Sequence, residues 1–248
     1  MRLGVVSDIH GNLAALEAVA DALASAGVDA IVNLGDCVSG PLLPAETARW
    51  LMHVGWPTIA GNHERQLLAL RDRGVGESAS DRFAAARLDA DAWHWIARLP
   101  PVLQLREGPL LCHGTPDSDL APLAHAIEQA RMVADTPARI ATRLPDIDAP
   151  VIACGHTHLP VAMRLEDGRL VVNPGSVGLQ AFRETRGTPY VVEAGSPHAR
   201  YAVLTRDAHG WRADLQHVAY DFESMAHLAE RHGAPDWAHA LRNGLAPA

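Results

Sequence analysis

Five short polar clusters combine aspartate, histidine and asparagine with glycine, and each lies at the end of a predicted strand. The clusters are Asp8-Ile9-His10-Gly11-Asn12, Gly35-Asp36, Gly61-Asn62-His63-Glu64, His113-Gly114 and Gly155-His156-Thr157-His158. In open α/β sheets, ligands bind at the carboxyl ends of the strands, so these clusters should converge in space. The glycines allow the backbone to turn tightly beside each polar side chain.

Two of the clusters repeat the same spacing of polar residues. In an extended chain, Asp8 and His10 lie on one side, so a carboxylate oxygen and an imidazole nitrogen can reach one metal ion. His156 and His158 are also two residues apart. Mixed oxygen and nitrogen ligation suits Mn, Fe, Zn or Ni better than Mg or Ca, which prefer oxygen ligands alone. A single Asp or His at a strand end is often only a turn or capping residue, so the prediction depends on the whole set.

Hydrophobic periodicity predicts the elements that must position these clusters. The expected strands are residues 2–7, 30–34, 57–60, 110–113 and 151–154, and the expected helices between them include residues 12–26 and 45–53. Alternation of strands and helices indicates a mainly parallel sheet. Between residues 64 and 101 the periodicity is helical and is broken at Gly74-Val75-Gly76, which predicts a helical insertion or cap.

The second half of the chain has a different character. Two helical stretches are expected across residues 122–144, and one or two outer helices at about 221–245. Short strands joined by turns are expected at residues 161–165, 170–173, 190–192, 201–205 and 211–217, which is typical of antiparallel pairing. We therefore expect one domain over residues 1–248 that contains both kinds of pairing.

Composition and charge exclude several classes of protein. With 21 Lys and Arg against 29 Asp and Glu, the net charge is −8, which argues against sequence-independent nucleic-acid binding. We expect no signal peptide before the first cluster, and no apolar run approaches the roughly 20 residues of a membrane span. Three cysteines, Cys37, Cys112 and Cys154, cannot all pair with one another, so a cytoplasmic location is expected. We expect none of them to be a metal ligand.

The ordered set D-x-H, G-D, G-N-H-E, H-G and G-H-T-H resembles that of the calcineurin-like metallophosphoesterase superfamily, and within it the small bacterial phosphodiesterase-like members. The resemblance runs from Leu3 to about Gly178 and includes the segment Asn173-Pro174-Gly175-Ser176-Val177-Gly178. It implies a four-layer α/β/β/α sandwich, in which two mixed sheets face each other with helices outside.

The resemblance also implies two divalent metal ions per chain, with Mn as the first expectation and Fe, Zn or Ni as alternatives. By position, it assigns Asp8, His10 and His158 to the first metal, Asn62, His113 and His156 to the second, and Asp36 as the bridge between them. A bridging hydroxide would attack phosphorus, because metal binding lowers the pKa of water to about 7. Asn62 and His63 would contact the substrate phosphate, and His63 is the candidate for protonating the leaving group.

One segment departs from the protein-phosphatase branch of the superfamily, which continues its second cluster as G-D-x-V-D-R-G. Here the segment is Gly35-Asp36-Cys37-Val38-Ser39-Gly40-Pro41, without the carboxylate that would orient His63 and without the Arg that would clamp phosphate. This argues against a protein phosphatase. Arg65 or Arg183 could clamp phosphate instead, although a solvated surface position is the simpler interpretation of each.

Three functions remain open from the sequence. The first is hydrolysis of a phosphodiester or other small phosphate ester. The second is hydrolysis of a dinucleoside polyphosphate such as diadenosine tetraphosphate, for which a helical cap could hold a nucleoside. The third is an inactive scaffold with the same fold, such as the retromer subunit of the superfamily. Scaffolds of this kind tend to lose ligands, whereas all seven ligand positions are kept here. The expected partner is therefore a small phosphate-ester substrate, with no membrane.

Overall fold

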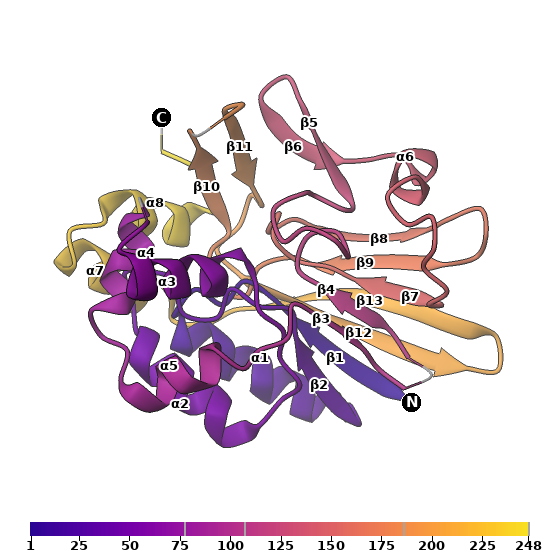
Figure 1. Ribbon diagram of the computed structural model, residues 1–248, viewed down its shortest axis with the longest axis horizontal. Coiled ribbons are helices and arrows are strands. Elements are labelled where there is room, and N and C mark those ends of the chain that lie inside the picture. The colour runs from indigo at the N-terminus through magenta and orange to yellow at the C-terminus, as the bar shows by residue number, and fades with distance from the viewer. Residues whose placement is uncertain (77, 107, 186, 248) are drawn as a thin grey trace.

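Two β-sheets face each other in the computed structural model, which describes residues 1–76, 78–106, 108–185 and 187–247 (Figure 1). The first sheet has the order β13-β12-β1-β2. Its strands are β1 (Arg2–Val6), β2 (Ala30–Asn33), β12 (Ala199–Asp207) and β13 (Gly210–Val218). β1 pairs with β2 in parallel and with β12 antiparallel, so this sheet is mixed.

The second sheet has the order β3-β4-β7-β9-β8 and is also mixed. β4, β7 and β9 are parallel, while β3 and β8 join antiparallel at the two edges. The strands are β3 (Val102–Gln104), β4 (Leu110–Cys112), β7 (Val151–Ala153), β8 (Pro160–Arg164) and β9 (Leu170–Pro174).

Helices lie outside the two sheets and beyond the ends of their strands (Figure 1). They are α1 (Leu13–Ser25), α2 (Pro44–Val54), α3 (Asn62–Arg73), α4 (Ala79–Ala85), α5 (Ala90–Ile96), α6 (Pro137–Ala141), α7 (Phe222–Arg231) and α8 (Pro235–Asn243). Helices α1, α2 and α5 pack into the hydrophobic cluster outside the first sheet, and α6 packs outside the second. The expected four-layer arrangement is therefore confirmed.

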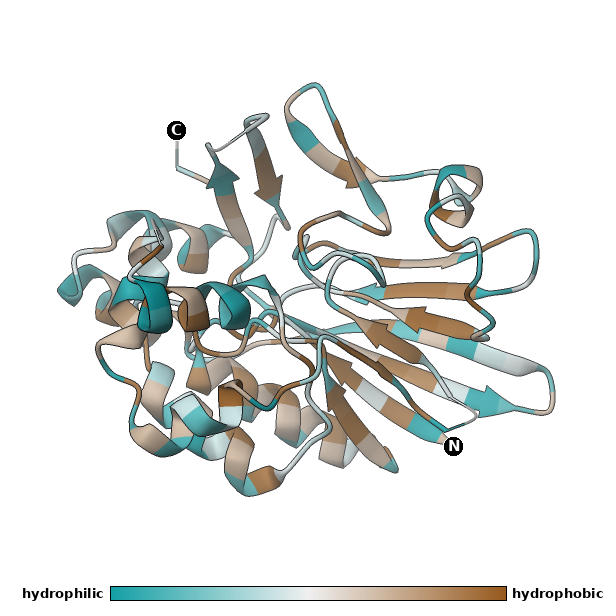
Figure 2. Cartoon of the chain, in the orientation of Figure 1, coloured by the Kyte–Doolittle hydropathy of each residue, from teal (hydrophilic) through white to brown (hydrophobic). Residues whose placement is uncertain are grey.

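Alternation along the strands builds the core between the sheets. On β1, Leu3 and Val5 face the second sheet and pack with Val151 and Val172, while Val6 faces the outer cluster that contains α1. Figure 2 shows the hydrophobic colour concentrated on the central strands. The carboxyl ends of β1, β4 and β7 are consequently held in fixed positions by neighbouring strands on both sides, and β2 pairs with β1 at the edge of its sheet.

The expectation of two helical stretches across residues 122–144 is wrong. The segment forms a hairpin of β5 (His125–Glu128) and β6 (Arg131–Ala134), followed only by the short helix α6. Its turn residues Gln129 and Ala130 have φ values of 48° and 58°, although such turns are usually marked by Asn or Gly. The hairpin joins β10 (Ala181–Glu184) and β11 (Tyr190–Glu193) in a third sheet of order β10-β11-β6-β5, which the sequence did not indicate.

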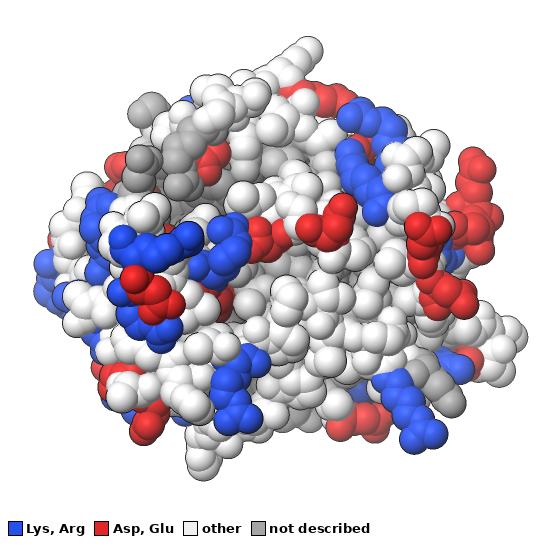
Figure 3. All heavy atoms as spheres, in the orientation of Figure 1, with Lys and Arg blue, Asp and Glu red and all other residues white. Residues whose placement is uncertain are grey.

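The remaining segments follow the predicted pattern closely. Three helices occupy the predicted helical segment before residue 101, and the break falls where α3 ends at Gly74, with φ of 66°. The strand expected at residues 57–60 is reduced to a single bridge between Thr58 and Asn33. No described helix is long and apolar enough to cross a membrane. On the face shown in Figure 3, basic and acidic side chains lie interspersed.

Candidate metal centre

The carboxyl ends of four central strands bring the predicted ligands together. Asp8 and His10 follow β1, Asp36 follows β2, His113 follows β4, and two histidines follow β7. Within the group of Asp8, His10 and His158, the candidate ligand atoms all lie within 4.8 Å of one another. The same holds within the group of Asp36, His113 and His156.

Asp36 and Asn62 connect and complete these groups. Oδ2 of Asp36 lies 3.1 Å from Nε2 of His113 and 4.0 Å from Nε2 of His10, so its carboxylate stands between the two groups. Oδ1 of Asn62, the first residue of α3, lies 3.1 Å from Nε2 of His113 and 3.0 Å from Nδ1 of His156. All seven predicted ligand residues are therefore brought together, with Asp36 at the centre.

Five of the seven residues have the left-handed backbone conformation that non-glycine residues rarely adopt. Their φ values are 55° for Asp8, 52° for His10, 53° for Asp36, 68° for His156 and 60° for His158. Such conformations cost of the order of 1–3 kcal/mol each and cluster at functional sites. These backbone conformations lower the stability of the fold, and they direct the side chains of the five residues toward the candidate metal centre.

Backbone carbonyl groups fix the orientation of three of the imidazoles. Nδ1 of His10, His113 and His158 each lies within hydrogen-bonding distance of a main-chain oxygen. The oxygens belong to Ser39 at 2.7 Å, Leu34 at 2.7 Å and Leu179 at 2.6 Å, respectively. A neutral imidazole that donates from Nδ1 keeps a lone pair on Nε2. The Nε2 atoms that point into the centre are thereby prepared as metal ligands.

The buried polar atoms of the first group fit a cation. Oδ1 of Asp8 is fully buried and makes no hydrogen bond, although it lies 3.4 Å from Nε2 of His158. Nε2 of His158 in turn lies 3.1 Å from Nε2 of His10. Two imidazole lone pairs that face each other beside an unpartnered carboxylate oxygen are unfavourable unless positive charge lies between them. The residues present therefore fit a bound metal ion.

Two of the imidazoles are already neutral without a metal, whereas a third carries a proton that a metal ion would displace. Burial, followed by the nearby His158, lowers the pKa of His10 to about 4. Burial, followed by the nearby His113, lowers the pKa of His156 to about 4. Both imidazoles are neutral near pH 7, as ligands must be. Burial acts to lower the pKa of His113, but Asp36 raises it to about 10.

The two carboxylates are ionised. Burial acts to raise the pKa of Asp8, but His158 and His113 together lower it to about 2. Burial acts in the same direction on Asp36, and His113 is the largest influence that holds its pKa well below the usual range. A set of two carboxylates, an amide oxygen and four imidazoles suits a first-row transition ion or zinc better than magnesium.

Glu64 ties the second and third clusters together. Its carboxylate accepts hydrogen bonds from the backbone N–H groups of Asp36, Cys37 and Gly61, each at 2.8 Å. No residue other than glycine fits at position 61, because a Cβ atom there would lie 2.2 Å from Oδ1 of Asp36. Glu64 is not among the predicted site residues, although an acidic residue at the third position of a helix is a recognisable capping signal.

His63 has a carboxylate partner, so the expectation that this chain lacks one is wrong. Nδ1 of His63 lies 2.7 Å from Oδ1 of Asp81, a buried residue of α4, and Oγ of Ser39 donates to the same oxygen at 2.6 Å. Burial acts to lower the pKa of His63, but Asp36 and Asp81 raise it to about 9. Ser39 stands where the protein-phosphatase branch has its carboxylate, and the helical segment supplies the carboxylate instead.

Asp81 was missed because its sequence context favours another role. Ser78 precedes it by three residues, and the Ser78 side chain accepts a hydrogen bond from the Asp81 backbone at the start of α4. The local pattern indicates a helix cap, and only the packing of α4 against the Ser39 loop reveals the second role.

The two arginines proposed to clamp phosphate have different positions. Arg183 lines a cavity of about 270 Å³ that also contacts His10, His63 and His156. Arg65 lies outside the residues described as lining that cavity. Its guanidinium makes two hydrogen bonds to Asp119, at 2.6 and 2.8 Å.

A four-layer sandwich with these clusters at the carboxyl ends of its strands defines a metallophosphoesterase fold. Residues 1–196 match the model of the calcineurin-like phosphoesterase superfamily domain. The chain therefore belongs to the calcineurin-like phosphoesterase superfamily, as the motif resemblance predicts.

Similar proteins span nearly the whole chain. An uncharacterized protein of Methanocaldococcus jannaschii is 24% identical over 245 residues, which cover 95% of this chain and 94% of that protein. The crystal structure of a metallophosphoesterase from Sphaerobacter thermophilus is similar with a TM-score of 0.75 at 24% identity, over 99% of this chain and 100% of that one. A hypothetical protein of Pyrococcus horikoshii gives a TM-score of 0.74 at 18% identity, over 99% of each chain. At these identities the two structures establish the fold.

Proposed function

We propose that the chain binds two divalent metal ions and hydrolyses a phosphodiester or another small phosphate ester. The observation that carries the proposal is the position of Asp36, whose Oδ2 lies 3.1 Å from Nε2 of His113 in one ligand group and 4.0 Å from Nε2 of His10 in the other. A carboxylate placed between two groups of imidazoles is suited to holding two ions close together. Superfamily membership supports the same reaction class.

The residues around Asp36 form the ligand sets of two metal ions. Asp8, His10 and His158 would hold one ion, and the other would be held by Asn62 with the remaining two histidines. When bound, two such ions supply a water with a pKa near 7 and positive charge for the phosphate oxygens. Mn is our first expectation, since the ligand set mixes oxygen and nitrogen.

His63 would act as the general acid that donates a proton to the leaving-group oxygen. It lines the cavity above the ligands, and its Nδ1 is engaged by Asp81, so the other ring nitrogen is the one left for substrate. Arg183, on the rim of the same cavity, would contact the phosphate, and Arg65 is already paired with Asp119. A positioned general acid contributes about 10² to 10⁴ in rate.

A substrate panel tests the reaction. The full chain with Mn²⁺ should hydrolyse a generic aryl phosphodiester, and Asp36→Asn should abolish this activity. Asp214→Asn, at an exposed position on β13, is the matched control and should retain it. Activity that survives both chelation and Asp36→Asn would contradict the dinuclear mechanism. Markedly faster turnover of diadenosine tetraphosphate in the same panel would favour a dinucleoside polyphosphate hydrolase.

Metal analysis separates an enzyme from an inactive scaffold. We expect about two equivalents of metal per chain, reduced in His156→Ala and retained in His217→Ala, which changes an exposed histidine of β13. Absence of metal from the wild-type chain after incubation with Mn²⁺ would support the scaffold interpretation.

A further inference from the structure

A second cavity, of about 410 Å³, adjoins the one above the metal ligands. Its walls come from α4, β10 and the segment from α7 to α8, three parts of the chain far apart in sequence. The two cavities have several lining residues in common, namely Ser80, Leu179, Phe182, Arg183 and Trp237. The two cavities therefore lie side by side, and a molecule whose phosphate lies on the metal ligands has the second cavity as its neighbour across these shared residues.

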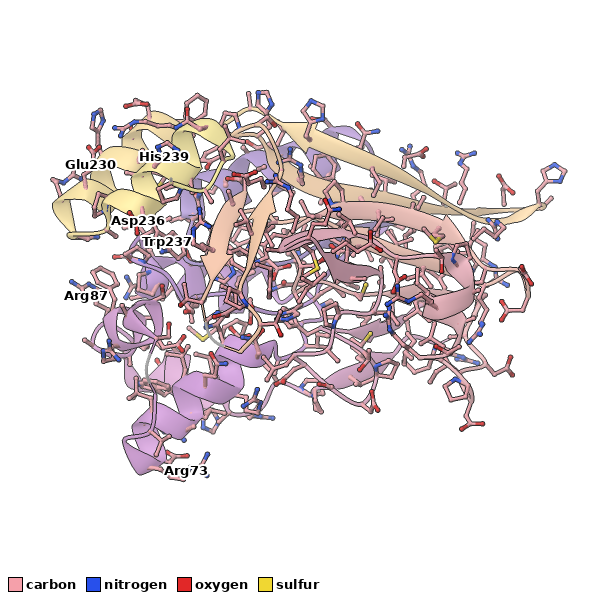
Figure 4. The ribbon with its side chains drawn as sticks, turned by 90° about the horizontal axis from the view of Figure 1, so that it is seen from above. Arg73, Arg87, Glu230, Asp236, Trp237 and His239 are labelled. Carbon is pink, nitrogen blue, oxygen red and sulfur yellow. The ribbon has the colours of Figure 1, made fainter. Side chains whose placement is uncertain are left out.

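Aromatic rings form the boundary between the two cavities. The Trp237 ring lies 5.9 Å from the His10 ring in an edge-on arrangement. The Phe182 ring lies 4.8 Å from the His158 ring, also edge-on. Both aromatic residues thus contact a candidate metal ligand on one side and line the second cavity on the other. Figure 4 places Trp237 between the C-terminal helices and the purple helices of the N-terminal half.

Two further rings that line the second cavity, those of Phe83 and His232, are held in place. Phe83 of α4 packs against the His232 ring with 4.8 Å between centroids, and the Arg87 guanidinium lies 3.4 Å from the Phe83 ring centroid. Nδ1 of His232 is hydrogen-bonded to the carbonyl oxygen of Pro41 at 2.8 Å. These contacts fix Phe83 and His232, so a ring that enters would meet an ordered wall.

The residues that line the second cavity indicate which kind of chemical group it can bind. Three aromatic side chains and the His232 ring line the cavity together with Ala181, which favours a flat apolar group that can stack or pack edge-on. Among the described residues that line the cavity, the charged side chains are Arg183 and Asp236, one of each sign, so neither a cationic nor an anionic group is favoured there. A small-molecule site is commonly such a largely apolar, preformed cavity beside a few polar groups.

We propose that this second cavity binds an aromatic ring carried by the phosphate ester, an aryl or heteroaryl group attached through oxygen to the phosphorus. The inference rests on the proposed function, because the metal centre positions the phosphate from which the ring extends. It adds the substrate class: esters with an aromatic group within reach of Trp237, Phe83 and Phe182, in preference to small alkyl esters.

Calorimetric titration of the Mn²⁺-loaded full chain with two phosphonates tests this directly. Benzylphosphonate and ethylphosphonate carry the same anionic group, resist hydrolysis and differ in the ring. We expect the Kd of benzylphosphonate to be about tenfold lower, equivalent to about 1.4 kcal/mol. In Trp237→Leu and Phe83→Ala, the ratio of the two Kd values should fall below about threefold.

Trp93→Leu is the matched control. Trp93 is a half-buried tryptophan of α5, packed beneath the Arg71 guanidinium, and lies outside the residues described as lining the cavity. This variant should keep the tenfold preference. Phe83 is included because it is only half-buried, so its truncation should leave the fold intact even if the loss of Trp237 does not.

The outcomes separate this inference from the proposed function. Equal Kd values in the wild-type chain, or a preference that persists in both cavity variants, would overturn the inference even if the protein hydrolyses esters. A tenfold preference that is lost in the variants supports the aromatic site. If that preference occurs in a chain that hydrolyses no ester, only the proposed reaction is contradicted, because calorimetry requires no turnover.

Discussion

Nδ1 of His63 lies 2.7 Å from Oδ1 of Asp81, and these two residues come from consecutive helices, α3 and α4. The same carboxylate oxygen accepts a hydrogen bond from Ser39, in the loop that carries Asp36. One buried carboxylate therefore links the helical segment to the metal-binding loop. The helical segment forms part of the candidate site instead of only covering it.

Replacing Asp81 with Asn should lower kcat by about 10- to 100-fold, because His63 would lose the partner that orients its ring and favours its protonated form. The loss should be larger for phenyl phosphate than for p-nitrophenyl phosphate, since a poorer leaving group depends more on protonation. Steady-state kinetics on the two substrates provides the measurement.

The control for this variant is Asp89→Asn. Asp89 caps α5 in the neighbouring part of the same helical segment, where its carboxylate accepts a hydrogen bond from the backbone of Ala92. The Asp89→Asn variant should leave the ratio of the kcat values for the two substrates unchanged. Equal losses on both substrates in Asp81→Asn would mean that the residue only supports the fold.

The contrast between Asp36 and Asp81 shows how far a sequence can predict such a site. Asp36 and the other ligands belong to short motifs at strand ends, so residue type and spacing are enough to find them. Asp81 reaches the site only because α4 packs against the loop of Ser39, and that contact leaves no trace in the local sequence. Short-range patterns predict ligands well and long-range partners poorly.

The same distinction holds for the fold. Strands with alternating or continuous apolar residues, such as β1 and β9, are visible in the sequence. The β5–β6 hairpin is not, because Gln129 and Ala130 replace the usual turn residues and β6 is stabilised by pairing with β11, which is distant in the sequence. The third sheet depends on such distant pairing, which propensity alone does not reveal.

Arg183→Gln should raise KM about tenfold with a smaller effect on kcat, because a charge-assisted contact to phosphate would be lost. Arg65→Gln is a natural control, since it removes the same charge near the site from a side chain that is paired with Asp119. Its KM should stay within about twofold of wild type. If Arg65→Gln raised KM more than Arg183→Gln did, Arg65 and not Arg183 would be the residue that contacts the phosphate.

Gly178→Ala should destabilise the chain by about 3 kcal/mol or more, because the added Cβ would lie 1.7 Å from the carbonyl oxygen of Ile9. Gly178 also donates a backbone hydrogen bond to the carbonyl oxygen of Asp8 at 3.0 Å, so metal content should fall as well. Urea unfolding and metal analysis measure the two effects.

Gly76→Ala provides the comparison. There the added Cβ would lie 3.4 Å from the Leu70 side chain, which is an ordinary contact. The free energy of unfolding should therefore change by no more than about 1 kcal/mol. If the two alanine variants unfold at the same urea concentration, the close approach of the Gly178 loop to Ile9 is not a constraint on the fold.

His125 should make the stability of the metal-free chain depend on pH. It lies buried on β5, with Nδ1 2.9 Å from Oγ1 of Thr157, the residue between two predicted ligands. Asn173 donates to the same hydroxyl at 3.0 Å, so the hydroxyl hydrogen is left for a neutral His125. Burial lowers the pKa of His125 from 6.5 to about 4.

The unfolded chain therefore takes up this proton at a higher pH than the folded chain does. The contribution of His125 to stability is complete above about pH 6.5 and is lost as the pH falls to about 4, by about 3 kcal/mol in total. His125→Gln cannot titrate, so the difference in unfolding free energy between wild type and this variant should decrease by that amount from pH 7 to pH 4. Urea titrations in a chelator at several pH values measure it, and taking the difference cancels the other histidines of the site. A difference that is constant over this range would show that His125 is protonated in the folded chain as readily as in the unfolded one.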